Sequence, residues 1–147
     1  LIAFDGTSAV CAQGPGGWHG PDARGQLQPR FQAKEKDPRK LGGFRGRLAL
    51  FEGRVYYAHA DGELTCFEAA TGNVIWSVKT PGFVHSLKLH EGRLWYSARD
   101  SGLHGVDAAT GKMEWTRPRR DVEAWTPVLR ENRVLWWSSE GWAIQPE

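Results

Sequence analysis

The chain has 147 residues, a formal net charge of +2 and 40% hydrophobic residues. This length is sufficient for a real core, and the near-balance of charge gives no reason to expect a polyanionic partner such as nucleic acid. No apolar run is long enough for a membrane-spanning helix. The two cysteines, Cys11 and Cys66, lack the CxxC spacing of metal and haem sites, and the sequence leaves open whether they form a disulfide.

The first 43 residues divide into two unlike parts. Residues 1–12 contain two short apolar runs around a turn, which predicts a half-blade of β structure. Residues 13–43 contain Gly-Pro pairs and several basic side chains and have no period of two or 3.6. Because long stretches of this kind are typical of loops, we expect an insertion or linker there, with Trp18 and Phe31 as candidate anchors.

From residue 44 onward the pattern becomes regular. Short strand-like runs are separated by Glu-Gly, Asp-Gly and Thr-Gly turns, and no segment has helical spacing. Four strands for each repeated unit are typical of a propeller blade. The propeller region, 44–147, is expected to contain two whole units and one without its outer strand, at 44–80, 83–118 and 124–147.

One motif occurs twice, 39 residues apart. Leu64–Trp76 reads LTCFEAATGNVIW and Leu103–Trp115 reads LHGVDAATGKMEW. A repeat of this period is typical of β-propellers. A position within it stays small, which the close approach of a neighbouring strand or an indole ring requires. Four units are aligned at this small position, at Ala3, Cys66, Gly105 and Ala143.

These segments resemble the tryptophan-docking repeat of the PQQ-like β-propellers, the quinoprotein dehydrogenase-like superfamily, which includes outer-membrane assembly lipoproteins. The resemblance implies an all-β fold: a partial β-propeller of four-stranded antiparallel blades, with about three to three and a half blades in this chain. It also implies that an acidic residue and a Thr-Gly turn join the third and fourth strands, while a Trp packs between blades. The blade-docking residues implied in this way are Glu68, Thr71, Gly72, Trp76, Asp107, Thr110, Gly111 and Trp115.

Two functions are compatible with this resemblance. One is a non-catalytic protein-interaction or scaffold module. The other is a fragment of a PQQ-dependent alcohol or sugar dehydrogenase, with PQQ and Ca²⁺ held mainly by blades outside this chain. We favour the first and assign no catalytic, cofactor-binding or metal-binding residues, because the sequence has no adjacent Cys pair, no G-x-S-x-G and no HxH or HxxxH spacing. A third hypothesis is an oligomer of partial propellers.

Other expectations concern the setting of the chain. It begins at Leu1 within a strand-like run and has no visible signal peptide, so we expect a fragment of a longer propeller. The expected partner is a protein, or the missing blades; the resemblance implies a periplasmic or extracytoplasmic location. His104 occupies the position of Thr65 in the preceding unit and is expected to be exposed. Arginines recur after the first turn of each unit, at Arg54, Arg93 and Arg133.

Overall fold

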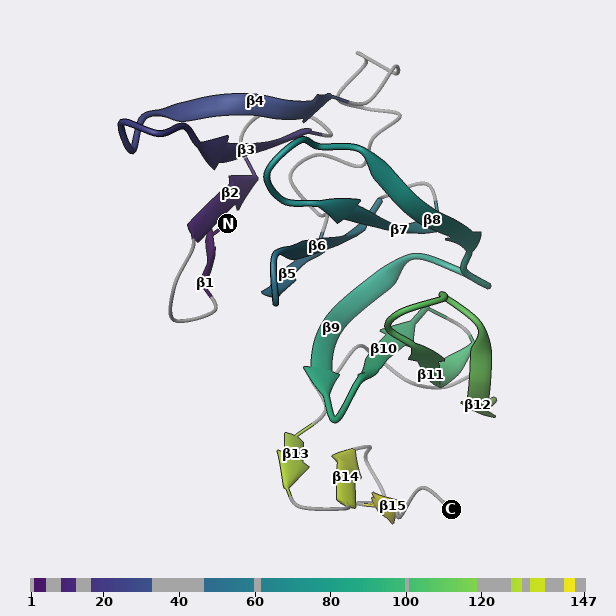
Figure 1. Cartoon of the computed structure of the whole chain (residues 1–147). Coiled ribbons are helices and arrows are strands. Elements are labelled where there is room, and N and C mark those ends of the chain that lie inside the picture. Colours follow the sequence, from purple (N-terminus) through teal and green to yellow (C-terminus); the bar gives the residue numbers. More distant parts are fainter. Residues whose placement is uncertain are drawn as a thin grey trace. The chain divides into compact units, whose positions relative to one another are not determined.

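The computed structural model describes residues 2–4, 9–12, 17–32, 47–59, 62–99, 101–118, 128–130, 133–136 and 142–144. These residues form strands and turns, and the strands make four antiparallel sheets (Figure 1). We number the sheets blades 1 to 4 in chain order; the first three have four strands and the last has three. Two compact units, Leu1–Lys79 and Thr80–Glu147, contain blades 1–2 and blades 3–4 respectively. The predicted all-β architecture of four-stranded antiparallel blades is confirmed.

Blade 1 is a complete sheet and corrects the prediction for this part of the chain. Its strands follow chain order: β1 (Ile2–Phe4), β2 (Ala9–Ala12), β3 (Gly17–Pro21) and β4 (Leu27–Gln32). The half-blade predicted over 1–12 therefore forms the first two strands of a whole blade. The linker predicted over 13–43 is wrong for residues 17–32, which form the third and fourth strands; residues 13–16 and 33–43 lie outside the described residues.

Turn chemistry and an edge position explain how a segment without alternation forms β3 and β4. The carboxylate of Asp22 accepts hydrogen bonds from the backbone N–H groups of Gln26, at 2.9 Å, and Arg24, at 2.8 Å, and these bonds lower its pKa. Pro29 lies in β4, an edge strand of its sheet. A missing N–H is tolerated there because one side of an edge strand has no ladder to complete.

Blades 2 and 3 follow the predicted repeat. Blade 2 consists of β5 (Arg47–Phe51), β6 (Arg54–Ala58), β7 (Glu63–Glu68) and β8 (Val74–Lys79). Blade 3 consists of β9 (Val84–His90), β10 (Arg93–Ala98), β11 (Gly102–Asp107) and β12 (Met113–Arg117). In both blades the second and third strands are buried and the fourth is largely exposed.

Blade 4 has the three strands that the sequence predicts for an incomplete unit. They are β13 (Val128–Arg130), β14 (Arg133–Trp136) and β15 (Trp142–Ile144). Ala143 lies in the third strand, as Cys66 and Gly105 do in their blades, whereas Ala3 lies in a first strand. The alignment of the small position is therefore correct for three units and wrong for Ala3, because β1 opens its blade.

The first hairpins of blades 2 and 3 have the same backbone conformation. Glu52 and Glu91 have φ of 46° and 48°, and the glycines that follow, Gly53 and Gly92, have φ of 71° and 73°. Positive φ at both central residues is the geometry of a type I′ turn, whose twist matches that of the flanking strands. A glutamate in this region carries a conformational cost of about 1–2 kcal/mol.

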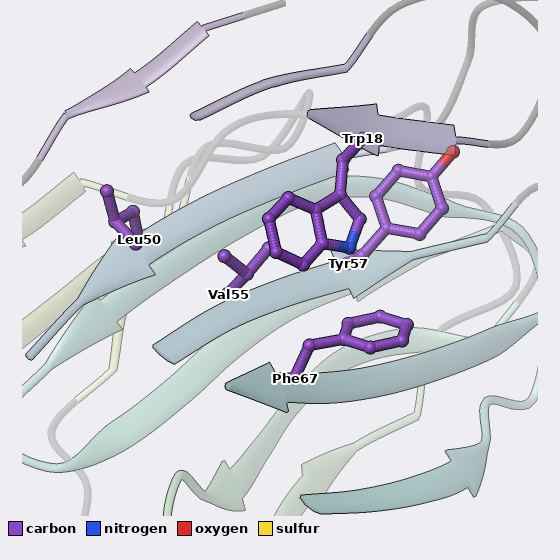
Figure 2. Close-up of a cluster of buried hydrophobic side chains, with 5 residues drawn as sticks. All are labelled: Trp18, Leu50, Val55, Tyr57 and Phe67. Carbon is purple, nitrogen blue, oxygen red and sulfur yellow. The ribbon is translucent and has the colours of Figure 1, made fainter. Parts of the chain in front are cut away.

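The core of the first unit forms where β3 of blade 1 faces blade 2. Trp18 is completely buried, and Figure 2 shows its indole ring over the side chains of Val55, Tyr57 and Phe67. The Trp18 and Phe67 ring centroids are 5.8 Å apart at an interplanar angle of 61°, an edge-to-face contact. Trp18 was expected to anchor a loop; it is instead the strand residue that packs blade 1 against blade 2.

Candidate functional site: the blade latch

The predicted docking residues build the same turn in blades 2 and 3, which we call the blade latch. In blade 2 it consists of Glu68, Thr71 and Gly72 with Trp76 on the following strand. The Thr71 hydroxyl donates to the Glu68 carboxylate and accepts a hydrogen bond from the Asn73 N–H at 3.1 Å. The Gly72 N–H donates to the Glu68 carbonyl at 2.8 Å. Gly72 has φ of 80°, a conformation that favours glycine.

The latch of blade 3 repeats these bonds. The Asp107 carboxylate accepts hydrogen bonds from the Thr110 hydroxyl at 2.6 Å and from its N–H at 2.7 Å. The Thr110 hydroxyl in turn accepts from the Lys112 N–H at 3.3 Å, and Gly111, with φ of 74°, donates to the Asp107 carbonyl at 2.8 Å. The Thr110 hydroxyl is the main cause of a lowered pKa at Asp107. The glutamate of blade 2 and the aspartate of blade 3 therefore both accept a hydrogen bond from the threonine hydroxyl of their latch.

Each latch is also tied to the first hairpin of its own blade. The Ala69 N–H donates to the Gly53 carbonyl at 2.8 Å, and the Ala108 N–H donates to the Gly92 carbonyl at 2.8 Å. The turn between the third and fourth strands is thus fixed to the turn between the first and second. This bond makes the latch end of the blade rigid, because two turns distant in sequence support each other.

The latch of blade 2 lies against blade 1. A Cβ atom placed on Gly72 would overlap the carbonyl oxygen of Arg30 in β4 and would stand 3.2 Å from the Arg30 Cβ. A Cβ on Gly20 in β3 would stand 3.4 Å from the Ala69 carbonyl oxygen. Glycine is therefore required at position 72 both for its positive φ and for the close approach of the two blades.

The latch tryptophans pack on aromatic rings of their own blades. Trp76 lies 6.0 Å from Tyr56 by ring centroids, at 45°, and Trp115 lies 5.4 Å from Trp95, at 64°. Both latch rings are partly exposed. The resemblance implies that these two rings are buried between neighbouring blades, and this remains a prediction. The indole that is completely buried between blade 1 and blade 2 is that of Trp18.

The small position separates each pair of rings. Cys66 is opposite Tyr56 on one side and Trp76 on the other, and Gly105 is opposite Trp95 and Trp115 in the same way. A Cβ on Gly105 would be only 3.2 Å from the Trp95 ring. The expected reason for a small residue, the close approach of an indole ring, agrees with this geometry. Cys66 is a buried free thiol, so it forms no disulfide, and burial raises its pKa to about 11.

The recurring arginine of blade 3 is engaged within its own blade. The Arg93 Nε donates to the Glu114 carboxylate at 2.7 Å, and the guanidinium carbon lies 5.5 Å from the centre of the Trp95 ring. The ion pair neutralises the guanidinium charge, and the cation–π contact places the guanidinium against the buried Trp95 ring. Arg93 therefore serves the packing around the latch.

Rows of polar side chains cross blades 2 and 3, and sequence reasoning did not foresee them. In blade 2 the row joins side chains of three segments, His59 to Thr65 at 3.1 Å and Thr65 to Ser77 at 3.0 Å. Ser77 and Lys79 donate to Glu63 and lower its pKa, Ser77 most strongly. Strand alternation would have indicated the row, because Glu63, Thr65 and Phe67 point to one face.

In blade 3 the row contains His104, for which the expectation of exposure is wrong. Its side chain is 4% exposed, and its ring stacks on Tyr96 with centroids 5.0 Å apart at 23°. Its Nε2 lies 2.7 Å from the Ser101 hydroxyl and its Nδ1 lies 2.9 Å from the Thr116 hydroxyl. Alternation again explains the burial, because His104 and Val106 lie on the same face of β11.

A calcium-dependent quinone site needs several oxygen or nitrogen ligands gathered around one ion. Among the described residues, no three His, Cys, Asp or Glu side chains are grouped so as to hold a metal ion. The sequence also has no adjacent cysteine pair. In the part of the chain that the structure describes, no helix has the length and apolar character needed to cross a membrane.

Four-stranded antiparallel blades, with the latch of blade 2 against blade 1 and the buried indole of Trp18 between these two blades, define a segment of a β-propeller. A family profile described as outer membrane protein assembly factor BamB matches residues 14–143. The chain therefore belongs to the BamB family, within the PQQ-like propellers. No curated protein matches the sequence.

Solved structures show the same fold at low sequence identity. The computationally designed protein Ika4 has a TM-score of 0.77 and 17% identity, over 97% of this chain and 86% of that one. BamB from Moraxella catarrhalis has a TM-score of 0.69 and 16% identity, over 92% of this chain and 40% of that one. A quinohemoprotein alcohol dehydrogenase, ADHIIG from Pseudomonas putida HK5, has a TM-score of 0.56 and 23% identity, over 76% and 19%. The chain thus spans less than half of either natural protein.

Proposed function

We propose that this chain forms part of a protein-binding β-propeller that acts as a scaffold in an extracytoplasmic assembly process. The observation that carries the proposal is the match of residues 14–143 to the family of the outer membrane protein assembly factor BamB. The partner in this proposal is a protein of the outer-membrane assembly process, and the latch of blade 2 holds that blade against blade 1.

Exposed apolar side chains on the outer strands support this role. In β8, Val74 and Ile75 are 58% and 45% exposed, and in β12 Met113 is 42% exposed. Val74 and Met113 occupy equivalent positions after their latches. Apolar side chains on a sheet edge offer both hydrophobic surface and unpaired backbone groups to another protein. Proline and charged residues on an edge strand discourage pairing with another chain. Such residues are Pro29 in β4 and Glu114 and Arg117 in β12. In β8 only Lys79, at the end of the strand, is of this kind.

The alternative is a fragment of a quinone-dependent dehydrogenase. It is favoured by the likeness to the quinohemoprotein alcohol dehydrogenase, which covers 76% of this chain. That likeness concerns the fold, and among the described residues no three His, Cys, Asp or Glu side chains are grouped so as to hold a metal ion. In this alternative the chain is a structural part of the propeller, and the cofactor is held by other blades.

Site-specific photo-crosslinking distinguishes the two proposals. A photoreactive phenylalanine analogue replaces Ile75 or Met113 in the full-length protein within its own cells, and Arg24, an exposed residue in the turn of blade 1, is the matched control site. We expect discrete protein adducts at positions 75 and 113 that are absent at position 24. The purified protein is then given pyrroloquinoline quinone and Ca²⁺. The scaffold proposal fails if no adduct exceeds the control and the protein oxidises alcohols in a quinone-dependent reaction.

A further inference from the structure

Three side chains of blade 3 place a hydroxyl, an imidazole and a second hydroxyl in one hydrogen-bonded row. Ser101, in the turn before β11, lies 2.7 Å from Nε2 of His104 through its Oγ atom. Nδ1 of the same ring lies 2.9 Å from Oγ1 of Thr116 in β12. A hydroxyl held against a histidine whose other nitrogen is oriented by a third group is the arrangement that activates a nucleophile.

We propose that Ser101 is an activated nucleophile that is acylated by activated carboxylic esters, with His104 as its general base and Thr116 as a positioning residue. When Nδ1–H donates to Thr116, Nε2 is the free acceptor for the Ser101 proton. This inference concerns one hydroxyl of blade 3 and does not depend on the protein-binding role.

Burial suits the residues to these roles. His104 is 4% exposed and stacked on Tyr96, which fixes the plane of its ring. Burial also lowers the His104 pKa, so the imidazole is neutral and able to accept a proton at neutral pH. Ser101 is only partly buried, and attack on a dissolved ester requires a residue that solvent can reach.

The reaction conserves atoms and charge. The Ser101 Oγ attacks the carbonyl carbon of the ester, and its proton passes to Nε2 of His104. The tetrahedral intermediate expels the alcohol or phenol, which takes the proton from the imidazolium as the carbon–oxygen bond breaks. The products are an acylated Ser101 and a free alcohol. Water then hydrolyses the acyl group, with His104 again the base, and the hydroxyl is restored.

Blade 2 contains a matched control. Thr65 holds the position of His104, and its hydroxyl lies 3.1 Å from Nε2 of His59. Thr65 is 3% exposed, so a hydroxyl paired with an imidazole is shielded from solvent there. If pairing with an imidazole and access to solvent are both required, Ser101 reacts and Thr65 does not.

The test is acylation of the purified chain by p-nitrophenyl acetate, followed by release of nitrophenol and by mass mapping of the acetylated peptide. We expect acetyl on Ser101 in the parent and in Thr65→Val, and none at that site in Ser101→Ala. His104→Gln is expected to slow acylation about 100-fold, the usual contribution of a general base. Thr116→Val is expected to slow it about tenfold, the equivalent of one net hydrogen bond.

Circular dichroism shows whether each variant is folded. The pH dependence of Ser101 acylation gives a second readout, which needs no variant. In the parent, acylation of Ser101 is expected to rise with pH as His104 loses its proton and then to level off. Acetyl found on lysines but not on Ser101 would overturn the proposal. So would a folded His104→Gln or Thr116→Val protein that reacts at the parent rate.

Discussion

The carbonyl oxygen of Arg30 in blade 1 occupies the space that a side chain on Gly72 in blade 2 would need. This contact joins the outer strand of one blade to the latch of the next. At this contact a turn motif that is local in sequence packs against a neighbouring blade. A substitution at Gly72 can therefore measure how much the latch contributes to the packing of the two blades.

Replacement of Gly72 by alanine tests this contact, with Gly53 as its matched control. Both glycines have positive φ, but a Cβ on Gly53 meets nothing within 4 Å. Gly53→Ala is therefore expected to lower the free energy of unfolding by about 1–2 kcal/mol, the conformational cost alone. Gly72→Ala is expected to lose a further 1–3 kcal/mol or so from overpacking. Urea unfolding measures the loss of stability in both variants. Equal losses would show that the close contact with Arg30 does not contribute to the cost of Gly72→Ala.

Truncation of two tryptophans compares the buried ring with a latch ring. Trp18→Ala is expected to destabilise the chain by about 3–5 kcal/mol, because the ring is completely buried. Trp76→Ala is expected to cost about half as much, because its ring is partly exposed and packs mainly on Tyr56. Thermal unfolding provides the comparison. A larger loss at Trp76 would contradict the assignment of Trp18 as the main packing residue of the first unit.

The first hairpins offer a stabilising change. Asparagine tolerates positive φ far better than glutamate and is favoured before glycine in type I′ turns. Glu52→Asn and Glu91→Asn are each expected to raise the free energy of unfolding by about 0.5–1 kcal/mol. Glu52→Gln removes the same charge without easing the backbone and is the control. If Gln and Asn stabilise equally, charge and not φ is responsible.

The burial of His104 predicts a pH dependence of stability. Its pKa is lowered in the folded state, so the unfolded chain binds more protons at this residue. Stability is therefore expected to fall as pH decreases below the ordinary histidine value of about 6.5. Asp107 and Glu63 also have lowered pKa values, and their contribution is lost only at more acidic pH, near and below about 4. His104→Gln is expected to flatten the stability profile near the ordinary histidine pKa. An unchanged slope in that pH range would show that another group causes it.

The features that could be predicted from sequence are those encoded locally. The latch forms through hydrogen bonds between residues two to five positions apart, such as Thr110 to Asp107, so the repeated AATG motif predicts it wherever it occurs. The strands of blades 2 and 3 likewise follow from alternation and from Glu-Gly turns. These elements need no knowledge of the rest of the fold.

Blade 1 and the hydrogen-bond partners of His104 could not be predicted in the same way. The strands GWHGP and LQPRFQ have no alternation, and they form where Asp22 closes a turn and Trp18 packs on blade 2. The contact between Gly72 and Arg30 joins residues far apart in the chain, and one sequence gives no sign of it. His104 lies on an inward face that alternation indicates, but its hydroxyl partners come from a turn and from another strand.

The protein-binding role is tested most directly by measuring the affinity of the full-length protein for the partner that crosslinks at position 75. Val74→Asp and Ile75→Asp place a charge on the exposed edge of β8, and Arg24→Asp places one on the turn of blade 1. We predict that each substitution in β8 weakens binding at least about tenfold, while Arg24→Asp leaves it unchanged. Unchanged affinity in both β8 variants, with folding intact, would contradict the account.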